Sequence, residues 1–179
     1  MARDPEGLVR DQAVEDVCAA ATARGIRILR DKDQVGLGES ISAFMQRIGV
    51  ADHVIVILSE KYLHSPFCMF ELFDLWRTSR IEKERFLPRI KLYSLLERSA
   101  WKAASRVRTA GHWRRERDDL AAAIDEAGVL AASEQDLRDL KLMDQFYSHV
   151  SEILALFADI VQFASIEQLA AHCFGEIKD

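Results

Sequence analysis

Cysteine is scarce in this sequence, and the positions of the few that occur argue against two kinds of structure. The three cysteines, Cys18, Cys68 and Cys173, are far apart, with no CxxC pair and no histidine at the spacing of a zinc site. Neither a disulfide framework nor a metal site is therefore expected. So little cysteine is typical of a reducing compartment, and we expect a cytoplasmic protein.

Long apolar segments and an excess of positive charge are also missing. No apolar run approaches the roughly 18 residues of a membrane span, and neither end carries a targeting or lipidation signal. The 29 acidic residues outnumber the 24 basic ones, which gives a net charge of −5. We therefore expect no membrane partner and, from the chain as a whole, no nucleic-acid partner.

Apolar residues make up 49% of the 179 residues, which is enough for the core of one domain. Their spacing predicts a first helix that opens at Pro5 and ends at Gly25. Short apolar runs predict strands at residues 26–29 and 54–58, the second fully buried, and residues 41–48 between them have helical spacing.

The alternation of strands and helices then continues. Ser65 and Pro66 supply an N-cap and a first-turn proline for a helix through Trp76, and residues 85–93 are the best candidate for a further strand. Strands separated by helix-length segments imply right-handed crossovers and a parallel sheet covered on both faces. The predicted fold class is therefore α/β, with a doubly wound parallel sheet.

Beyond Tyr93 the pattern becomes helical. Residues 101–127 and 137–162 have helical spacing, residues 166–173 form a last short stripe, and no confident strand is found. We therefore predict a core at residues 1–93 and, at residues 94–179, a helical completion or extension of the same domain.

A single carboxylate, Glu71, interrupts the apolar run "SPFCMFELF". It lies in the second turn of a predicted helix that follows the carboxyl end of a strand, where open α/β sheets bind ligands. On pattern alone, an acid that faces water or interacts with the helix dipole is the favoured interpretation. For Cys68, likewise, a small buried side chain is favoured over a nucleophile.

Three motifs occur together in this region: "RD" at residues 30–31, "S..Y..S" at residues 59–65, and "FCMFEL" at residues 67–72. Their combination resembles the bacterial Toll/interleukin-1 receptor (TIR) domains, in which the last motif has the form "[WF]C..EL". The resemblance covers residues 5–93 and implies the flavodoxin-like TIR fold, followed by a helical C-terminal extension.

The resemblance also implies an activity, because many TIR domains hydrolyse NAD⁺. The family's catalytic glutamate corresponds to Glu71, which reverses the preference stated above. Phe67, Cys68, Arg30 and Asp31 correspond to substrate-binding positions, although the family usually has tryptophan where this chain has Phe67. NAD⁺ is then the substrate, cleaved to nicotinamide and ADP-ribose or a cyclic variant, and neither a cofactor nor a metal is implied.

Two functions from different classes follow from the resemblance. The first is an NAD⁺ glycohydrolase that acts as a bacterial defence effector. The alternative is a non-catalytic module that assembles with TIR domains of other copies or of a sensor protein, since the loop at residues 30–40 in this family both borders the substrate cleft and packs in assemblies. A weaker third reading is an N-glycosidic enzyme that acts on nucleosides.

The chain departs from the family pattern at its beginning. TIR domains ordinarily start with a central strand that carries a motif like "FISY", and no such segment precedes the first predicted helix. In order of preference, we expect a translation start placed too far downstream, a natural truncation, or a strand supplied by another chain. Without that strand two inner sheet edges lack partners, so we expect this chain alone to fold poorly and to cleave NAD⁺ slowly or not at all.

A basic stretch at residues 98–117 places several cations beside Trp101 and Trp113. Such a composition can bind phosphates or single-stranded nucleic acid. Acidic residues at 116, 118 and 119 dilute the charge at its end, however. A solvated helix face or a subunit contact is therefore the favoured interpretation.

Overall fold

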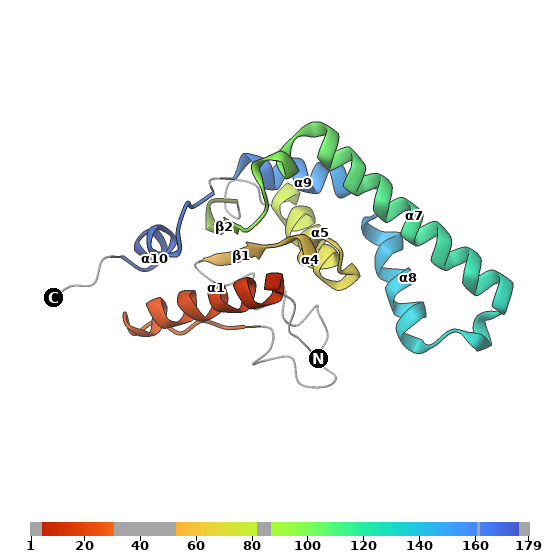
Figure 1. Cartoon of the computed structure of the whole chain (residues 1–179), viewed down its shortest axis with the longest axis horizontal. Helices are drawn as coiled ribbons and strands as arrows, with labels where there is room; N and C mark the ends of the chain where they lie inside the picture. Colours follow the sequence, from red (N-terminus) through yellow and green to blue (C-terminus); the bar gives the residue numbers. More distant parts are fainter. Residues whose placement is uncertain (1–4, 31–52, 82–86, 161, 176–179) are drawn as a thin grey trace. The chain divides into compact units, whose positions relative to one another are not determined.

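A computed structural model describes residues 5–30, 53–81, 87–160 and 162–175 (Figure 1). The contacts divide the chain into two compact units. The first consists of Met1–Ser59, Glu84–Leu95 and Val161–Asp179, and the second of Glu60–Lys83 and Leu96–Ile160. Each unit is described by itself.

The first unit contains a parallel sheet. Strand β1 (Val54–Leu58) pairs with β2 (Ile90–Ser94), with Val54 opposite Ile90, and the sheet formed by the described residues has two strands. On β2, Leu92 forms an isolated parallel bridge with Gln162. The N–H of Phe163 donates to the Leu92 carbonyl at 3.2 Å, so parallel pairing also involves a segment more than sixty positions further along the chain.

Two helices among the described residues of the first unit accompany this sheet. Helix α1 (Pro5–Thr22) contacts α10 (Ile166–Phe174), and the Arg24 side chain donates to the Gly175 carbonyl at 2.8 Å. A short 3-10 turn, η1 (Leu87–Arg89), leads into β2. The side chains that these helices bury include Val17, Ala21, Leu169 and Ala170.

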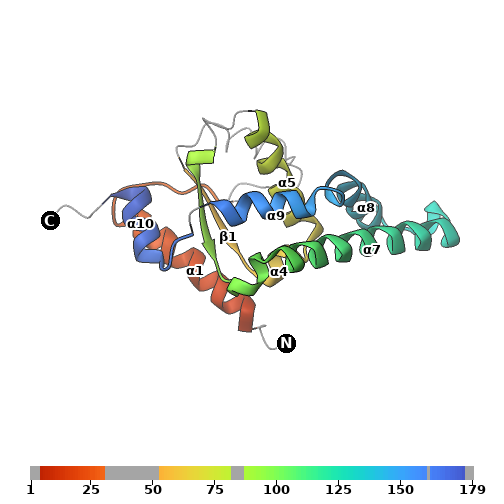
Figure 2. The same cartoon turned by 90° about the horizontal axis from the view of Figure 1, so that it is seen from above.

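The second unit is helical. After α4 (Glu60–Leu63) and α5 (Pro66–Ile81), the 3-10 turn η2 (Arg98–Trp101) leads into the long helix α7 (Ala103–Ala127). The turn η3 (Val129–Ala131) then reverses the chain into α8 (Glu134–Phe146), and α9 (Val150–Asp159) lies beside α7 (Figures 1 and 2). The buried side chains of this unit include Met69, Leu72, Leu75, Trp113, Leu142, Met143, Phe146, Val150, Ile153, Leu154 and Phe157.

Local signals mark the ends of these helices. Gly128 follows α7 with φ of 84°, a conformation that side chains with a Cβ rarely adopt. Ser133 and Asp136 form a capping box at the start of α8, in which the Asp136 carboxylate accepts from the Ser133 N–H at 2.8 Å. The hydrogen bonds from the Ser133 hydroxyl and N–H lower the pKa of Asp136 below its usual value.

Trp113 connects three helices of the second unit. It is 2% exposed, its indole N–H donates to the Leu63 carbonyl of α4 at 3.0 Å, and its ring meets Phe146 of α8 edge-on at 5.0 Å. A buried indole needs such an acceptor, because an unpaired N–H is costly inside a protein. Trp113 therefore fixes where α4 lies against α7.

Most of the predicted elements are confirmed within the described residues. The structure has the helix that opens at Pro5, the strand at Val54–Leu58, the helix that opens at Pro66, and helix α7. The strand predicted at residues 85–93 is present as Ile90–Ser94. The helix predicted at residues 41–48 lies outside the described residues.

Two predicted strands require correction. Residues 26–29 form no strand, and Ile26 and Leu29 are 37% and 39% exposed. A strand exists only by pairing with a neighbour, and β1 and β2 are the strands that pair in the described part of the chain. The strand at residues 54–58 is not fully buried, because Ile55 and Ile57 are partly exposed although Val54, Val56 and Leu58 are buried.

The region after Tyr93 also differs from its prediction. The single helix expected at residues 137–162 is two helices, α8 and α9, separated at Tyr147–His149. The apolar stripe runs on through the bend without a glycine or proline, so no local signal marked it. The parallel bridge at Gln162 was missed, because a one-residue pairing leaves no periodic pattern.

None of the helices in the described ranges combines the length and the apolar character that crossing a membrane requires.

Candidate active site

The helix that carries Glu71 begins where its sequence predicts. Pro66 is the first residue of α5, and the Ser65 hydroxyl accepts from the N–H of Cys68 at 3.4 Å. The Ser65 carbonyl accepts from the N–H of Met69 at 2.9 Å, which closes the first helical turn. These contacts set the register of α5, and they place Glu71 in its second turn.

Glu71 is half-buried and bonded to a tyrosine. The hydroxyl of Tyr62, on α4, donates to Oε2 of Glu71 at 2.8 Å in a partly buried position. A bond from a neutral hydroxyl to a carboxylate orients the acid and leaves its charge in place. Glu71 is therefore a partly buried acid that is oriented by a hydrogen bond from a residue of another helix.

The position of Tyr62 is fixed in turn through the next residue, Leu63. Leu63 is 5% exposed, and its carbonyl accepts the indole N–H of Trp113. The bond from Trp113 to Leu63 thus anchors the short helix from which Tyr62 reaches Glu71. Tyr62 is part of the "S..Y..S" motif in the sequence, and that motif was the one signal for a role of this residue. Its contact with Glu71 was not predicted.

Phe67 and Cys68 lie on the same side of α5 as Glu71. They precede it by four and three positions, the spacing at which helical side chains are neighbours. Phe67 is 38% exposed, and Cys68 is a partly exposed cysteine. An exposed aromatic ring one turn from a half-buried carboxylate can stack on a planar heterocycle while the acid faces an attached sugar.

Arg30 belongs to the first unit, whereas Glu71 belongs to the second, and each is described within its own unit. Nη1 of Arg30 lies 2.7 Å from Oε1 of Glu15 and 3.9 Å from Sγ of Cys18, both on α1. These residues, with Arg27, line a surface hollow of about 470 Å³. Asp31, the other predicted substrate-binding residue, lies outside the described residues.

No group of three or more histidine, cysteine, aspartate or glutamate side chains within the described ranges could hold a metal ion. The described side chains around Glu71 offer a carboxylate, a phenol, a thiol and an aromatic ring.

A comparison with protein families agrees with the motifs around Glu71. The family model for the TIR domain matches residues 9–127, more than half of the chain. The chain belongs to the TIR domain family. No match was found among curated proteins or among solved structures.

Membership in the TIR domain family establishes the α/β fold class and indicates two candidate functions. It supports NAD⁺ cleavage or association with other TIR domains, and it does not choose between them. The matched range includes Arg30, Phe67, Cys68 and Glu71 and ends with α7. The domain boundary at residue 93 and the poor folding expected of the isolated chain stay predictions.

Proposed function

We propose that this TIR domain is an NAD⁺ glycohydrolase in which Glu71 is the catalytic carboxylate. The observation that supports the proposal is the geometry at Glu71, an acid bonded at 2.8 Å by Tyr62 on a partly open helix face that also carries Phe67. An acid with only a structural role needs no such face. A ring and an oriented charge are together suited to a pyridine base attached to a ribose.

The reaction breaks the bond between the ribose C1′ and the nicotinamide nitrogen. The bonding electron pair moves to the positively charged pyridine ring, so nicotinamide leaves as a neutral molecule and needs no proton. Positive charge then develops on the ribose, and a fixed carboxylate stabilises this oxocarbenium-like transition state. Water adds to C1′ and releases a proton, which gives ADP-ribose; attack by a group of the substrate itself gives a cyclic product.

The other residues have supporting roles in this proposal. Phe67 stacks on a ring of the dinucleotide, and Cys68 lines the same face of α5. Arg30 and Asp31 are assigned to substrate binding because the "RD" motif of this chain matches that of the family. Tyr62 is a positioning residue, because it acts through Glu71.

The test is the variant Glu71→Gln, which preserves the size of the side chain and removes its charge. Nicotinamide release from NAD⁺ is measured chromatographically, at high protein concentration and long incubation because turnover by the isolated chain is expected to be slow. We expect the rate to fall by at least about 100-fold, the usual cost of removing a transition-state electrostatic contact.

The matched control is Glu134→Gln, which makes the same change at an exposed acid on α8 and should leave the rate unaltered. If Glu71→Gln cleaves NAD⁺ as fast as the unaltered chain, assembly with other TIR domains becomes the better account. Turnover of nucleosides in place of NAD⁺ would instead support the third reading.

A further inference from the structure

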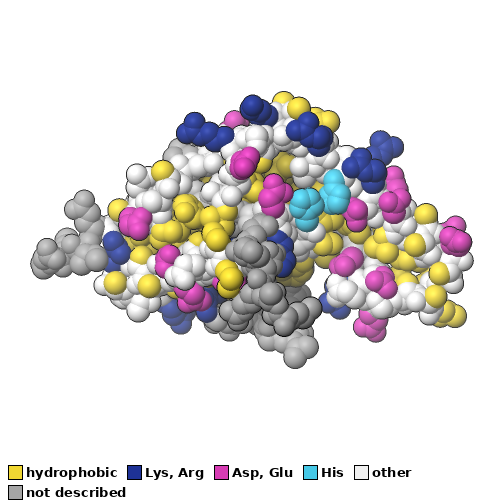
Figure 3. Space-filling model, in the orientation of Figure 1, with side chains coloured by type: hydrophobic (Ala, Val, Ile, Leu, Met, Phe, Trp, Pro, Cys, Tyr) yellow, Lys and Arg dark blue, Asp and Glu magenta, His cyan; other side chains and the backbone are white. Residues whose placement is uncertain are grey.

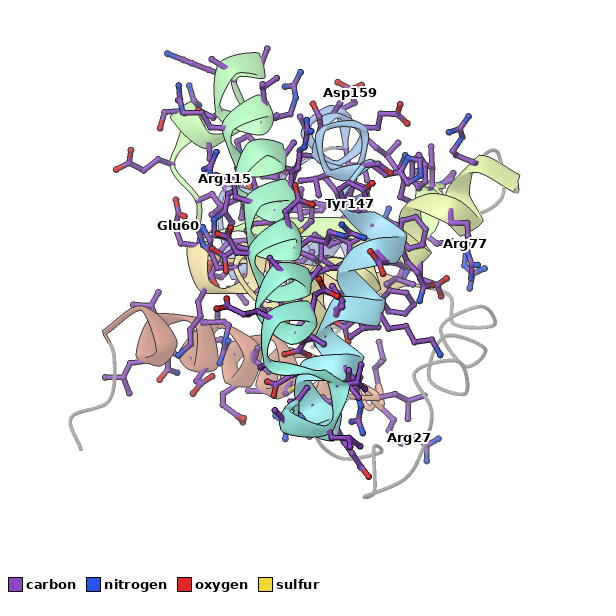
Figure 4. All side chains as sticks on the ribbon, turned by 90° about the vertical axis from the view of Figure 1, so that its right-hand side faces the viewer. Arg27, Glu60, Arg77, Arg115, Tyr147 and Asp159 are labelled. Carbon is purple, nitrogen blue, oxygen red and sulfur yellow. The ribbon has the colours of Figure 1, made fainter. Side chains whose placement is uncertain are left out.

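Helix α7 has a packed side and an outward side. Trp113 is buried, and Arg117 donates to Asp144 of α8 at 2.6 Å, so these residues mark the packed side. Figure 4 shows Arg115 and Tyr147 on opposite sides of α7, and Tyr147 is the C-cap residue that follows α8. The outward side includes Val107, which is 62% exposed.

The outward side carries its charges in a strict order. Cations occupy the first half, with Arg108, Arg114 and Arg115 exposed, and acids occupy the second half, with Asp118, Asp119, Asp125 and Glu126 exposed. In Figure 3, dark blue gives way to magenta along the course that α7 takes in Figure 1. The basic stretch singled out in the sequence is thus the first half of a helix whose second half is acidic.

Several of these charges have no partner within the described structure. The side chains of Arg115, Asp119 and Asp125 form neither a hydrogen bond nor an ion pair with any described residue. Asp118 lies 3.8 Å from Arg114 and 3.1 Å from Arg117, which are contacts along the same helix. The middle of α7 therefore presents an unpaired cation, Arg115, and its second half presents unpaired acids, Asp119 and Asp125.

One stripe on this side repeats at alternating steps of four and three residues, the spacing of a coiled-coil seam. The stripe is complementary to its own reverse: in the reversed order an aspartate stands opposite each arginine, and a small residue stands opposite each small residue. The stripe consists of Arg108, Gly111, Arg115, Asp118, Ala122 and Asp125.

We propose that this stripe is an interface with a second copy of the chain, in which the two α7 helices pair antiparallel about a twofold axis between Arg115 and Asp118. Arg115 of one protomer then faces the partner's Asp118, and Arg108 faces the partner's Asp125. Because the contact is isologous, each pair occurs twice. A parallel arrangement would place like charges opposite each other, which charge complementarity disfavours.

Small residues allow the two helices to approach closely in this register. Gly111 of one protomer faces the partner's Ala122, close to the centre of the contact. Among the described residues, a Cβ placed on Gly111 would lie 3.5 Å from Nη1 of Arg115, which is an ordinary contact with the end of a flexible side chain. Helix α7 has 25 residues, about 37 Å of helix, so the seam is long enough for both sets of ion pairs.

The interface does not depend on NAD⁺ cleavage, because none of its residues lies on α4 or α5. Its partner is a second copy and not another acidic or basic protein, since the helix supplies both complementary halves itself.

The experiment exchanges charges at the centre of the seam. In Arg115→Asp, positions 115 and 118 are both acidic, and in Asp118→Arg both are basic. Two copies of the same variant therefore repel each other at the centre of the seam. We expect the unaltered chain to form a dimer in sedimentation velocity runs at low salt and to dissociate as sodium chloride is added, because surface charges are screened. Each variant alone should be a monomer, and an equimolar mixture of the two should restore a dimer.

Lys141→Asp on α8 is the matched control, since it makes the change of Arg115→Asp at another exposed cation and should not affect association. Circular dichroism checks that all variants keep their helix content. A monomeric unaltered chain at low salt, a dimer of either single variant, or a mixture that stays monomeric would each overturn the proposal. The mixture also distinguishes the result from misfolding, because two damaged chains would not repair each other.

Discussion

At the scale of the residue, two acids on α5 occupy different environments. Asp74 is 7% exposed, and Arg77, one turn later, donates a hydrogen bond to it. That pair satisfies a buried charge within the helix itself. Glu71 is less buried, and its bond comes from Tyr62 on another helix. An acid oriented from outside its own helix, beside an exposed ring, is the one with a geometry suited to a ligand.

We predict that Tyr62→Phe slows NAD⁺ cleavage without unfolding the protein. The variant removes the hydroxyl that donates to Glu71 and keeps the ring. A hydrogen bond to a charged group contributes about 1.5–3 kcal/mol, so we expect a loss of about 10- to 100-fold in kcat. The measurement is nicotinamide release at saturating NAD⁺, compared with the unfolding midpoint in urea.

Tyr147→Phe is the control for that experiment, because it removes a hydroxyl from the same unit. The ring that Arg117 covers at 5.6 Å is retained in this variant. If both variants slow the reaction equally, Tyr62 has no special role in orienting Glu71.

At the scale of the element, the start of α5 carries the site. Ser65 accepts the Cys68 N–H through its hydroxyl and the Met69 N–H through its carbonyl. We predict that Ser65→Ala destabilises the protein by about 1 kcal/mol, the usual cost of losing an N-cap. It should also raise the KM for NAD⁺, because Phe67 and Cys68 lie in the turn that the cap holds.

Urea unfolding and steady-state kinetics measure these two effects. Ser65→Thr retains a capping hydroxyl and should restore most of the stability, whereas Ser148→Ala, at an exposed serine between α8 and α9, should have no effect. Equal stability of Ser65→Ala and the unaltered chain would show that the cap is dispensable.

Elements with local signals were predictable, and elements without them were not. The cap and proline at Ser65-Pro66 and the short apolar run at Val54–Leu58 are signals carried by neighbouring residues. The strand predicted at residues 26–29 was wrong because strand formation depends on a partner elsewhere in the chain. The bridge at Gln162 was missed for the same reason, since its partner Leu92 is on a distant segment.

At the scale of the whole molecule, Trp113 links the core of the second unit to the candidate site. It is bonded to Leu63, which precedes the loop to α5, and it packs against Phe146. We predict that Trp113→Ala costs about 3–5 kcal/mol, the range for removing a buried aromatic side chain. This is a large share of the roughly 5–15 kcal/mol that stabilises an ordinary protein.

Urea unfolding followed by circular dichroism tests this prediction, with Val129→Ala as a control because Val129 is 61% exposed. Because Trp113 anchors α4, the variant should also impair the contact between Tyr62 and Glu71, and nicotinamide release should fall further than the loss of folded protein explains. An unchanged urea midpoint would show that Trp113 does not stabilise the second unit.

The amino-acid sequence by itself determined the family, the helix that carries Glu71, and the charge order along α7, because motifs, caps and helical spacing are properties of neighbouring residues. Tertiary structure alone decided that Tyr62 reaches Glu71, that Trp113 holds Leu63, and that Gln162 pairs with Leu92. Those contacts join different elements, and the bond from Trp113 to Leu63 spans 50 residues. Such contacts arise from packing the elements together, and no local pattern encodes which side chains will then meet.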